Sequence, residues 1–160
     1  SEMCIRDSNN VGPYLAGILV QRRSGCDLVS YLTPRLFDHL EIKRPMWETD
    51  PLGRSFGAGG LFLTLSELHK FGLFYRDKGK WNGRQLLSER WIEESTKAAD
   101  SPEYGYLFWR GEYNSYRADG KYCQISMVLP DKNAVVSVVS ECRDGEGFKR
   151  AVYDLVCAQL

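Results

Sequence analysis

The chain of 160 residues carries 21 Lys and Arg residues against 21 Asp and Glu residues, so its formal net charge is zero. No positive excess draws it to phosphate backbones or acidic membranes, which argues against nucleic acid as a partner. Its apolar runs are shorter than the ~20 residues that cross a bilayer, so we expect no membrane segment, and its length suits one domain or part of one.

The five cysteines show no CxxC spacing and their number is odd, which argues against a disulfide framework and a zinc cluster. They are Cys4, Cys26, Cys123, Cys142 and Cys157. We expect reduced, mostly buried thiols, which favours the cytoplasm, although the compartment stays open. Neither His39 nor His69 has a second ligand at metal-binding spacing. We therefore expect no metal and no cofactor.

Two helices are expected first. Pro13 in a first turn and Gly25 as a stop signal predict a helix over residues 13–24. Asp27 as N-cap predicts a second helix over residues 27–39. The segment that follows is rich in proline and glycine and has no sustained period, which is typical of a long loop that serves a site.

Two more helices follow this loop. Thr64 and Glu67 form a capping box that starts a helix ending near residue 77. Asn82-Gly83 predicts a tight turn, and Ser88 caps a helix that ends near residue 97.

From Tyr104 the apolar period changes from that of a helix to that of a strand. The strand-like runs cover residues 104–112, 115–120, 121–130 and 133–142. A closing helix over residues 146–158 is expected to face this sheet with Phe148, Val152, Leu155 and Val156. Helices followed by an antiparallel sheet with a C-terminal helix packed on it define an α+β fold.

Five segments, in chain order, carry a resemblance to a known family. They are SNNVGPYLAG, SGCDLVSYLTPRLF, WETDPLGRSFGAGGLFLTLSELHKFGLFYRDKGKWNGRQLLSERWI, YGYLFWR and YRADGKYCQISMVLPD. From about Ser8 to Leu160 the chain resembles the C-terminal part of the serine hydrolases related to class C β-lactamases and penicillin-binding proteins. The most specific stretch runs from Trp47 to Trp91. The resemblance implies the C-terminal part of the β-lactamase/transpeptidase-like fold.

In that family a serine of an SxxK motif attacks a carbonyl, and the lysine of that motif and the tyrosine of a YxN motif move the proton. The chain has no SxxK motif. By its spacing from the first helix, YxN falls on residues 8–10. Asn10 matches the asparagine, whereas Ser8 stands at the position of the tyrosine.

A third motif borders the site in this family. Ala118, Asp119 and Gly120 resemble it in its AxG form, with a register open by a residue or two. The backbone N–H of Lys121 would then be an oxyanion donor. Where relatives usually carry Gly-Gln in the next strand, this chain has a cysteine, Cys123, before the glutamine.

Four residues are candidates for substrate binding in the same cleft, namely Trp47, Gly59, Gly60 and Tyr116. Glycine lets a backbone approach a ligand closely. The alternative stays open that the glycines only serve turns and that the aromatic rings belong to the core.

Residues 1–8 are expected to be a non-native or truncated segment, with residues 9–160 forming a partial domain. SEMCIRDS resembles the translation of a sequencing-adaptor remnant joined to a truncated bacterial, metagenomic reading frame; a native start is the alternative. The parent is then a serine hydrolase that acts on an ester, amide or β-lactam-like acyl compound, and this fragment alone is inactive and poorly soluble. A catalytically dead member that binds a peptide or partner protein is the other reading. The oligomeric state is open.

Overall fold

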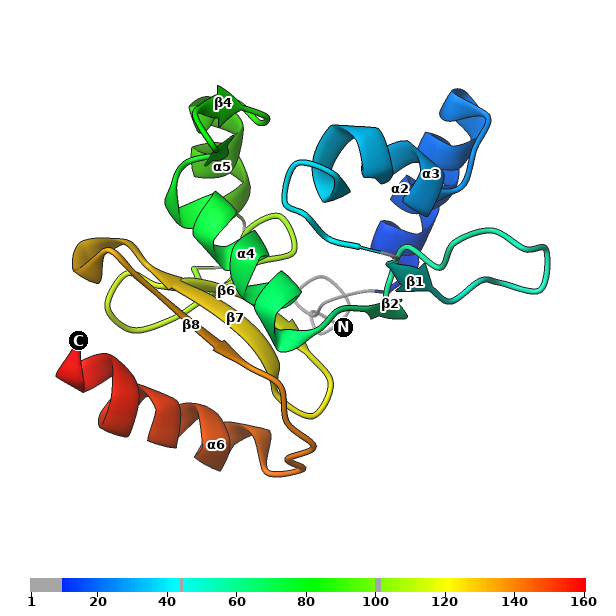
Figure 1. Cartoon of the computed structure of the whole chain (residues 1–160). Helices are drawn as coiled ribbons and strands as arrows, with labels where there is room; N and C mark the ends of the chain where they lie inside the picture. Colours follow the sequence, from blue (N-terminus) through cyan, green and yellow to red (C-terminus); the bar gives the residue numbers. More distant parts are fainter. Residues whose placement is uncertain (1–9, 44, 100–101) are drawn as a thin grey trace. The chain divides into compact units, whose positions relative to one another are not determined.

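The structure is a computed structural model that describes residues 10–43, 45–99 and 102–160, and the chain forms two compact units, Ser1–Glu67 and Leu68–Leu160. The first unit holds helical turns and a short hairpin, and the second holds an antiparallel sheet between helices (Figure 1). The elements are α2 (Val11–Ser24), α3 (Leu28–Leu32), η1 (Thr33–Phe37), β1 (Met46–Trp47), β2 (Leu61–Phe62), α4 (Leu65–Arg76), β3 (Lys80–Trp81), β4 (Arg84–Gln85), α5 (Glu89–Thr96), β5 (Trp109–Arg110), β6 (Tyr116–Gly120), β7 (Gln124–Leu129), η2 (Pro130–Lys132), β8 (Ala134–Val138), α6 (Gly145–Ala151), η3 (Val152–Val156) and η4 (Cys157–Gln159). The predicted α+β class is confirmed.

The helices of the first unit follow their predicted caps. Gly25 ends α2 in the left-handed region at φ 73°, and the Asp27 carboxylate accepts the N–H of Ser30 at 2.9 Å. The sequence predicted one continuous helix over residues 27–39, but the structure interrupts it. After α3 the chain widens into the π-turn η1. Pro34 has no N–H to donate there, so the regular hydrogen-bond ladder cannot run through it.

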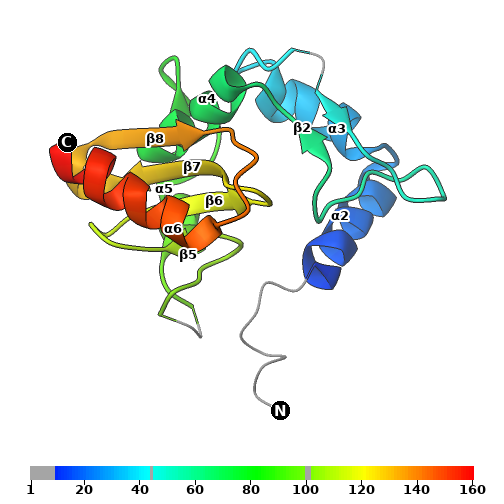
Figure 2. The same cartoon turned by 90° about the horizontal axis from the view of Figure 1, so that it is seen from below.

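The sheet of the second unit has the strand order β5-β6-β7-β8, and all neighbours are antiparallel. α4 lies over one face of this sheet and α6 over the other (Figures 1 and 2). The core on the α6 side is formed by Cys123, Ile125, Met127, Leu129, Val152, Tyr153 and Cys157. Because side chains alternate along a strand, β7 contributes every second residue to this core.

α4 starts at the predicted capping box, in which Thr64 N donates to Glu67 Oε2 at 2.9 Å. It packs closely on the sheet at Gly72, where an added Cβ would lie 2.5 Å from Ser126 Oγ and 2.6 Å from a methyl group of Val135. No side chain fits this gap, so glycine sets how near the helix approaches the sheet. A second tie joins His69 Nδ1 and Ser137 Oγ at 3.0 Å.

The turn and cap between α4 and α5 are also as predicted. Asn82 and Gly83 both have positive φ, 46° and 79°, and join the paired strands β3 and β4. The Ser88 hydroxyl accepts the N–H of Trp91 at the start of α5. No described helix is long and apolar enough to span a membrane.

Two details of the sheet region differ from the prediction. The strand predicted over residues 104–112 is reduced to β5, because Leu107 has a left-handed φ of 67° that breaks the extended run. The prediction that Leu155 and Val156 face the sheet is wrong, since they are 71% and 43% exposed. The π-turn η3 adds residues to the helical turn, so Tyr153 and Cys157 face the sheet instead.

Candidate functional site

The predicted site residues divide between the two units, and each group is described within its own unit. Asn10, Trp47, Gly59 and Gly60 belong to the first unit, and Tyr116, Ala118, Asp119, Gly120 and Lys121 to the second.

Asn10 lies directly before α2 and is exposed. Its carbonyl accepts the N–H of Tyr14 at 3.2 Å, while its side chain makes no capping hydrogen bond. The side-chain amide is therefore not used to hold the helix. Ser8 and Asn9, the other two positions of the YxN-like motif, lie outside the described residues.

The indole of Trp47 is tied to the long loop. Its Nε1 donates to the carbonyl of Phe56 at 3.0 Å and to that of Gly59 at 2.8 Å. The loop backbone returns to the strand through two further bonds, from Glu48 N to Gly60 O and from Phe56 N to Glu48 O. Trp47 thus fixes the shape of the loop, and its role in binding a substrate stays a prediction.

The two loop glycines differ in what they require. Gly60 has φ 74°, and an added Cβ would lie 2.6 Å from Cβ of Glu48, so both its conformation and its surroundings demand glycine. Gly59 is exposed and donates its N–H to Phe56 O at 3.1 Å. Gly60 therefore serves the turn, and the surface near Gly59 is open.

Two contacts that the sequence did not suggest hold this loop on α2. The buried Gln21 side chain donates to Ser55 O at 3.1 Å and accepts from Ser55 N at 2.9 Å, so it pairs both backbone groups of one loop residue. Nearby, the Cα of Gly17 lies 3.2 Å from the Cβ position that Gly57 lacks. A lone glutamine in a helix gives no signal of such a partner 34 residues later.

An ionic cluster closes the other end of the loop. The Asp50 carboxylate accepts from the Tyr14 hydroxyl and from Arg54 Nε, both at 2.7 Å, and from the backbone N–H of Leu52 and Arg54. Burial by itself would raise the pKa of Asp50, but these hydrogen bonds outweigh it and hold the pKa well below its usual range. Asp50 is thus ionised at neutral pH.

In the second unit Tyr116 belongs to the core. It is 6% exposed, packs edge to face against Phe108, and donates its hydroxyl to the carbonyl of Tyr75 at 3.2 Å. Burial raises the pKa of this hydroxyl, with Tyr75 adding to the effect. This placement agrees with the alternative that the aromatic rings belong to the core, and a role of Tyr116 in binding a substrate stays a prediction.

The third-motif residues lie at the end of β6. Alternation places Ala118 and Gly120 on the face that carries Tyr116, whereas Asp119 faces α6. There its carboxylate accepts from Arg117 Nε at 2.9 Å and lies 3.9 Å from Lys149 Nζ. Asp119 therefore belongs to an ion-pair network behind the strand. Ala118 and the exposed Gly120 lie on the other face, where an added Cβ at Gly120 would lie 3.1 Å from Cβ of Gln124.

Lys121 opens the turn between β6 and β7, which is closed by the pairing of Gly120 with Gln124. Its ammonium group lies 4.7 Å from the ring centre of Tyr122. Tyr122 and Cys123 both have left-handed φ values, 61° and 65°. The tight turn places the backbone of Lys121 at the exposed tip of the hairpin.

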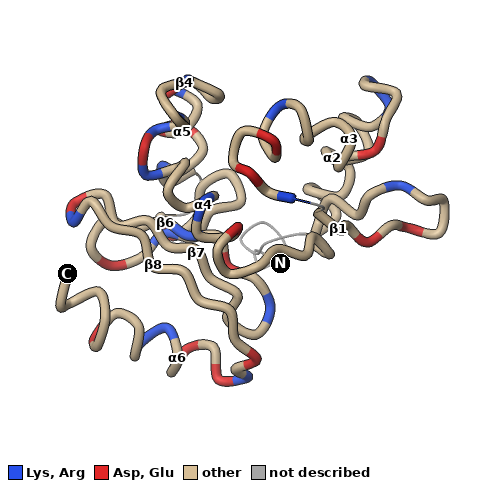
Figure 3. The backbone as a smooth tube through the Cα atoms, in the orientation of Figure 1, with Lys and Arg blue, Asp and Glu red and all other residues tan. Residues whose placement is uncertain are grey.

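A groove of mixed charge runs between β5, β6 and α6. Its walls include Arg110, Arg117, Asp119, Lys149, Arg150 and Tyr153. The basic side chains there are paired, and Arg150 Nη1, for example, lies 2.7 Å from Glu112 Oε1. Figure 3 shows that basic and acidic residues are interspersed along the chain. Among the described residues, no group of three or more His, Cys, Asp or Glu side chains is arranged to hold a metal ion.

Solved structures with the same fold belong to proteins named as hydrolases and penicillin-binding proteins. A Bacillus anthracis protein that carries the name of a 6-aminohexanoate-dimer hydrolase has a TM-score of 0.80 at 18% identity, covering 92% of this chain and 41% of its own. A Mycobacterium bovis β-lactamase gives 0.70 at 18% identity, with 92% and 63% coverage. A Bacillus halodurans penicillin-binding protein gives 0.71 at 19% identity, with 96% and 56% coverage.

These likenesses define the fold. The chain has the fold of these β-lactamase and penicillin-binding protein structures, and it spans about half the length of the solved proteins it matches. No protein-family model matches the chain, and comparison with curated protein sequences gives no match.

Proposed function

We propose that the chain is the C-terminal portion of a serine hydrolase that forms an acyl-enzyme on an ester, amide or β-lactam-like compound. The proposal rests on the arrangement of residues at the end of β6 in a chain with this fold. There Ala118 and Gly120 share one face and Lys121 follows at an exposed tip. Small residues beside a backbone N–H suit the wall of an acyl-binding cleft, because a carbonyl can approach closely.

The chain supplies one part of the reaction in this proposal. Lys121 N–H, in the second unit, stabilises the developing oxyanion. Asn10 and the loop held by Trp47, in the first unit, remain separate predicted site residues. The nucleophile and its base come from an SxxK motif that this sequence does not contain. Residues 9–160 are then a partial domain, and this chain alone forms no acyl-enzyme.

The first experiment reads the source DNA upstream of the codon for Ser8. A continuous frame that encodes an SxxK motif, and tyrosine in place of Ser8, supports the proposal. An upstream region without such a motif refutes it and directs the work to the alternative, a catalytically dead member that binds a peptide or a partner protein.

The second experiment measures acylation of the longer protein by a fluorescent penicillin and by a fluorophosphonate, with the adduct followed by intact mass. Lys121→Pro removes the proposed oxyanion donor and is expected to slow acylation about 100- to 1,000-fold. Lys121→Ala is the matched control, because it keeps the N–H and removes only the side chain. Equal rates for the two variants would exclude the oxyanion role of this backbone group.

A further inference from the structure

Cys123 occupies a position that costs a side chain conformational energy. Its φ of 65° lies in the left-handed region, which glycine adopts freely and other residues rarely adopt. Cys123 is also 5% exposed and belongs to the core cluster beneath α6. Glycine at this position would remove the backbone strain. Residues other than glycine that are held in such conformations cluster at functional sites.

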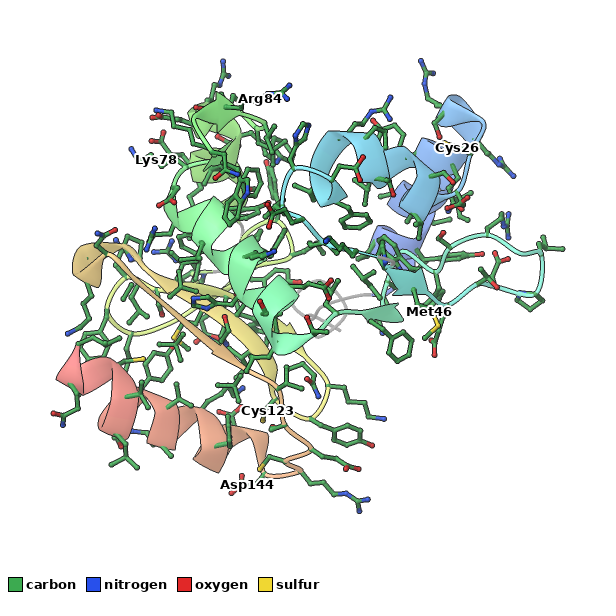
Figure 4. All side chains as sticks on the ribbon, viewed as in Figure 1. Cys26, Met46, Lys78, Arg84, Cys123 and Asp144 are labelled. Atoms are coloured by element: carbon green, nitrogen blue, oxygen red, sulfur yellow. The ribbon has the colours of Figure 1, made fainter. Side chains whose placement is uncertain are left out.

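A second cysteine lies beside it. Cys142, in the segment between β8 and α6, packs against the same cluster, and its carbonyl O lies 4.0 Å from Cys123 Sγ. Figure 4 labels Cys123 where the β6–β7 hairpin meets the segment leading to α6. The two cysteines therefore lie 19 residues apart in sequence but adjacent in the fold, and the Cys142 thiol lies 3.5 Å from the carbonyl oxygen of Asp144.

One hydroxyl fixes the two backbones relative to each other. Ser140 Oγ donates to the carbonyl of Tyr122 at 2.7 Å, lies 3.3 Å from the carbonyl oxygen of Cys123, and accepts the N–H of Cys142 at 3.4 Å. The side chain of Gln124 adds a bond to Ser140 O at 2.5 Å. These contacts hold the backbone of the hairpin turn and that of the segment before α6 against each other.

We propose that Cys123 and Cys142 are a dithiol that oxidises to an intramolecular disulfide, which joins the β6–β7 hairpin to the segment before α6. The other described cysteines have different neighbours. Cys157 Sγ lies 3.9 Å from Met127 Sδ in the core, and Cys26 Sγ lies 3.5 Å from Ser24 Oγ. The site goes beyond acyl transfer and does not depend on it.

The oxidant is a low-molecular-weight disulfide such as glutathione disulfide. The half-buried Cys142 meets it first: its thiolate attacks one sulfur, and one glutathione leaves as a thiolate that takes up a proton. The Cys123 thiol then loses its proton and attacks Cys142 Sγ, which releases the second glutathione. Two protein thiols and one glutathione disulfide become one protein disulfide and two glutathione thiols. Burial raises the pKa of the Cys123 thiol, with Cys142 adding to the shift, so this second attack is the slower step.

The test incubates the folded chain with glutathione disulfide, blocks remaining thiols by alkylation, and digests with trypsin without reduction. Cleavage after Lys121, Lys132 and Arg143 places the two cysteines in the peptides 122–132 and 133–143. The proposal predicts the loss of two hydrogens and a single linked species made of these two peptides. Its yield should be complete in a chain whose other three cysteines are changed to serine.

Cys123→Ser and Cys142→Ser must each abolish the linked species, and Cys26→Ser must leave it unchanged. The linked chain should also melt at a higher temperature than the same chain after reduction, because the disulfide constrains the unfolded state. Recovery of both peptides in alkylated form, only glutathione adducts, or a link to another cysteine would each overturn the proposal.

Discussion

Gln21 offers a direct test of how the long loop of the first unit is held. Its side chain bonds both the N–H and the carbonyl of Ser55, which is 2% exposed. Gln21→Met keeps a similar volume and leaves both groups without partners. Each unsatisfied buried group costs about 1–3 kcal/mol, so after the gain from the apolar side chain we expect a loss of about 2–4 kcal/mol.

The assay uses the positions of the four tryptophans. Trp47 lies in the first unit and Trp81, Trp91 and Trp109 in the second. With 5-fluorotryptophan incorporated, urea unfolding can be followed by fluorine NMR at each site. We expect the Trp47 transition to move to lower urea in Gln21→Met, while Ala16→Gln on the exposed face of α2 changes it by no more than a few tenths of a kcal/mol.

Gln21→Glu adds a pH test of the same geometry. One carboxylate oxygen still accepts from Ser55 N, but the other faces the carbonyls of Ser55 and Gly17, which repel the ionised form. The folded pKa of this glutamate is then raised above its unfolded value of about 4.3. Its stabilisation is present below that value and is lost as the pH rises through the folded pKa. If Gln21→Met unfolds like the control, or Gln21→Glu is equally stable at about pH 5 and pH 7, the argument from these hydrogen bonds fails.

Three further outcomes are expected. Gly72→Ala should destabilise the second unit by about 1–3 kcal/mol, because the new Cβ clashes with Ser126 and Val135. The control is Gly12→Ala, whose new Cβ meets no atom within 4 Å. A loss of equal size in this control would contradict the packing argument. Asp50 has a lowered pKa, so its stabilisation is present above the unfolded value of about 3.9 and is lost as the pH falls through the folded pKa. The Trp47 fluorine signal should therefore report unfolding in acid, and Asp50→Asn should flatten that dependence; an unchanged acid profile would show that another group controls it. In the second unit no described strand pairs with the outer side of β8, whose sequence has no charge and no proline. We expect the chain to associate with rising concentration in sedimentation velocity, and Val139→Lys to reduce this association; a monomer at all concentrations would refute it.

Local sequence signals predicted the elements whose causes are local. The capping box at Thr64 and Glu67, the Asn82-Gly83 turn and the caps at Asp27 and Ser88 all formed where the sequence indicated. Each depends on a side chain and a backbone group a few residues apart, so one segment contains the whole interaction. Alternation also predicted β6, β7 and β8 and, with them, the α+β class, whereas the first predicted strand was reduced to β5.

Interactions between distant segments were decided by the tertiary structure alone. The partner of Gln21 lies 34 residues away and that of Cys123 lies 19 residues away, and no period in the sequence links either pair. Strand alternation could have placed Asp119 opposite Ala118 and Gly120, but only the structure showed the Arg117 and Lys149 groups that hold it. Likewise, the sequence marked Tyr116 as aromatic beside a site, whereas packing against Phe108 and Tyr75 made it core. Burial and pairing depend on what the rest of the chain brings to a residue, and a residue type by itself carries no record of its neighbours in space.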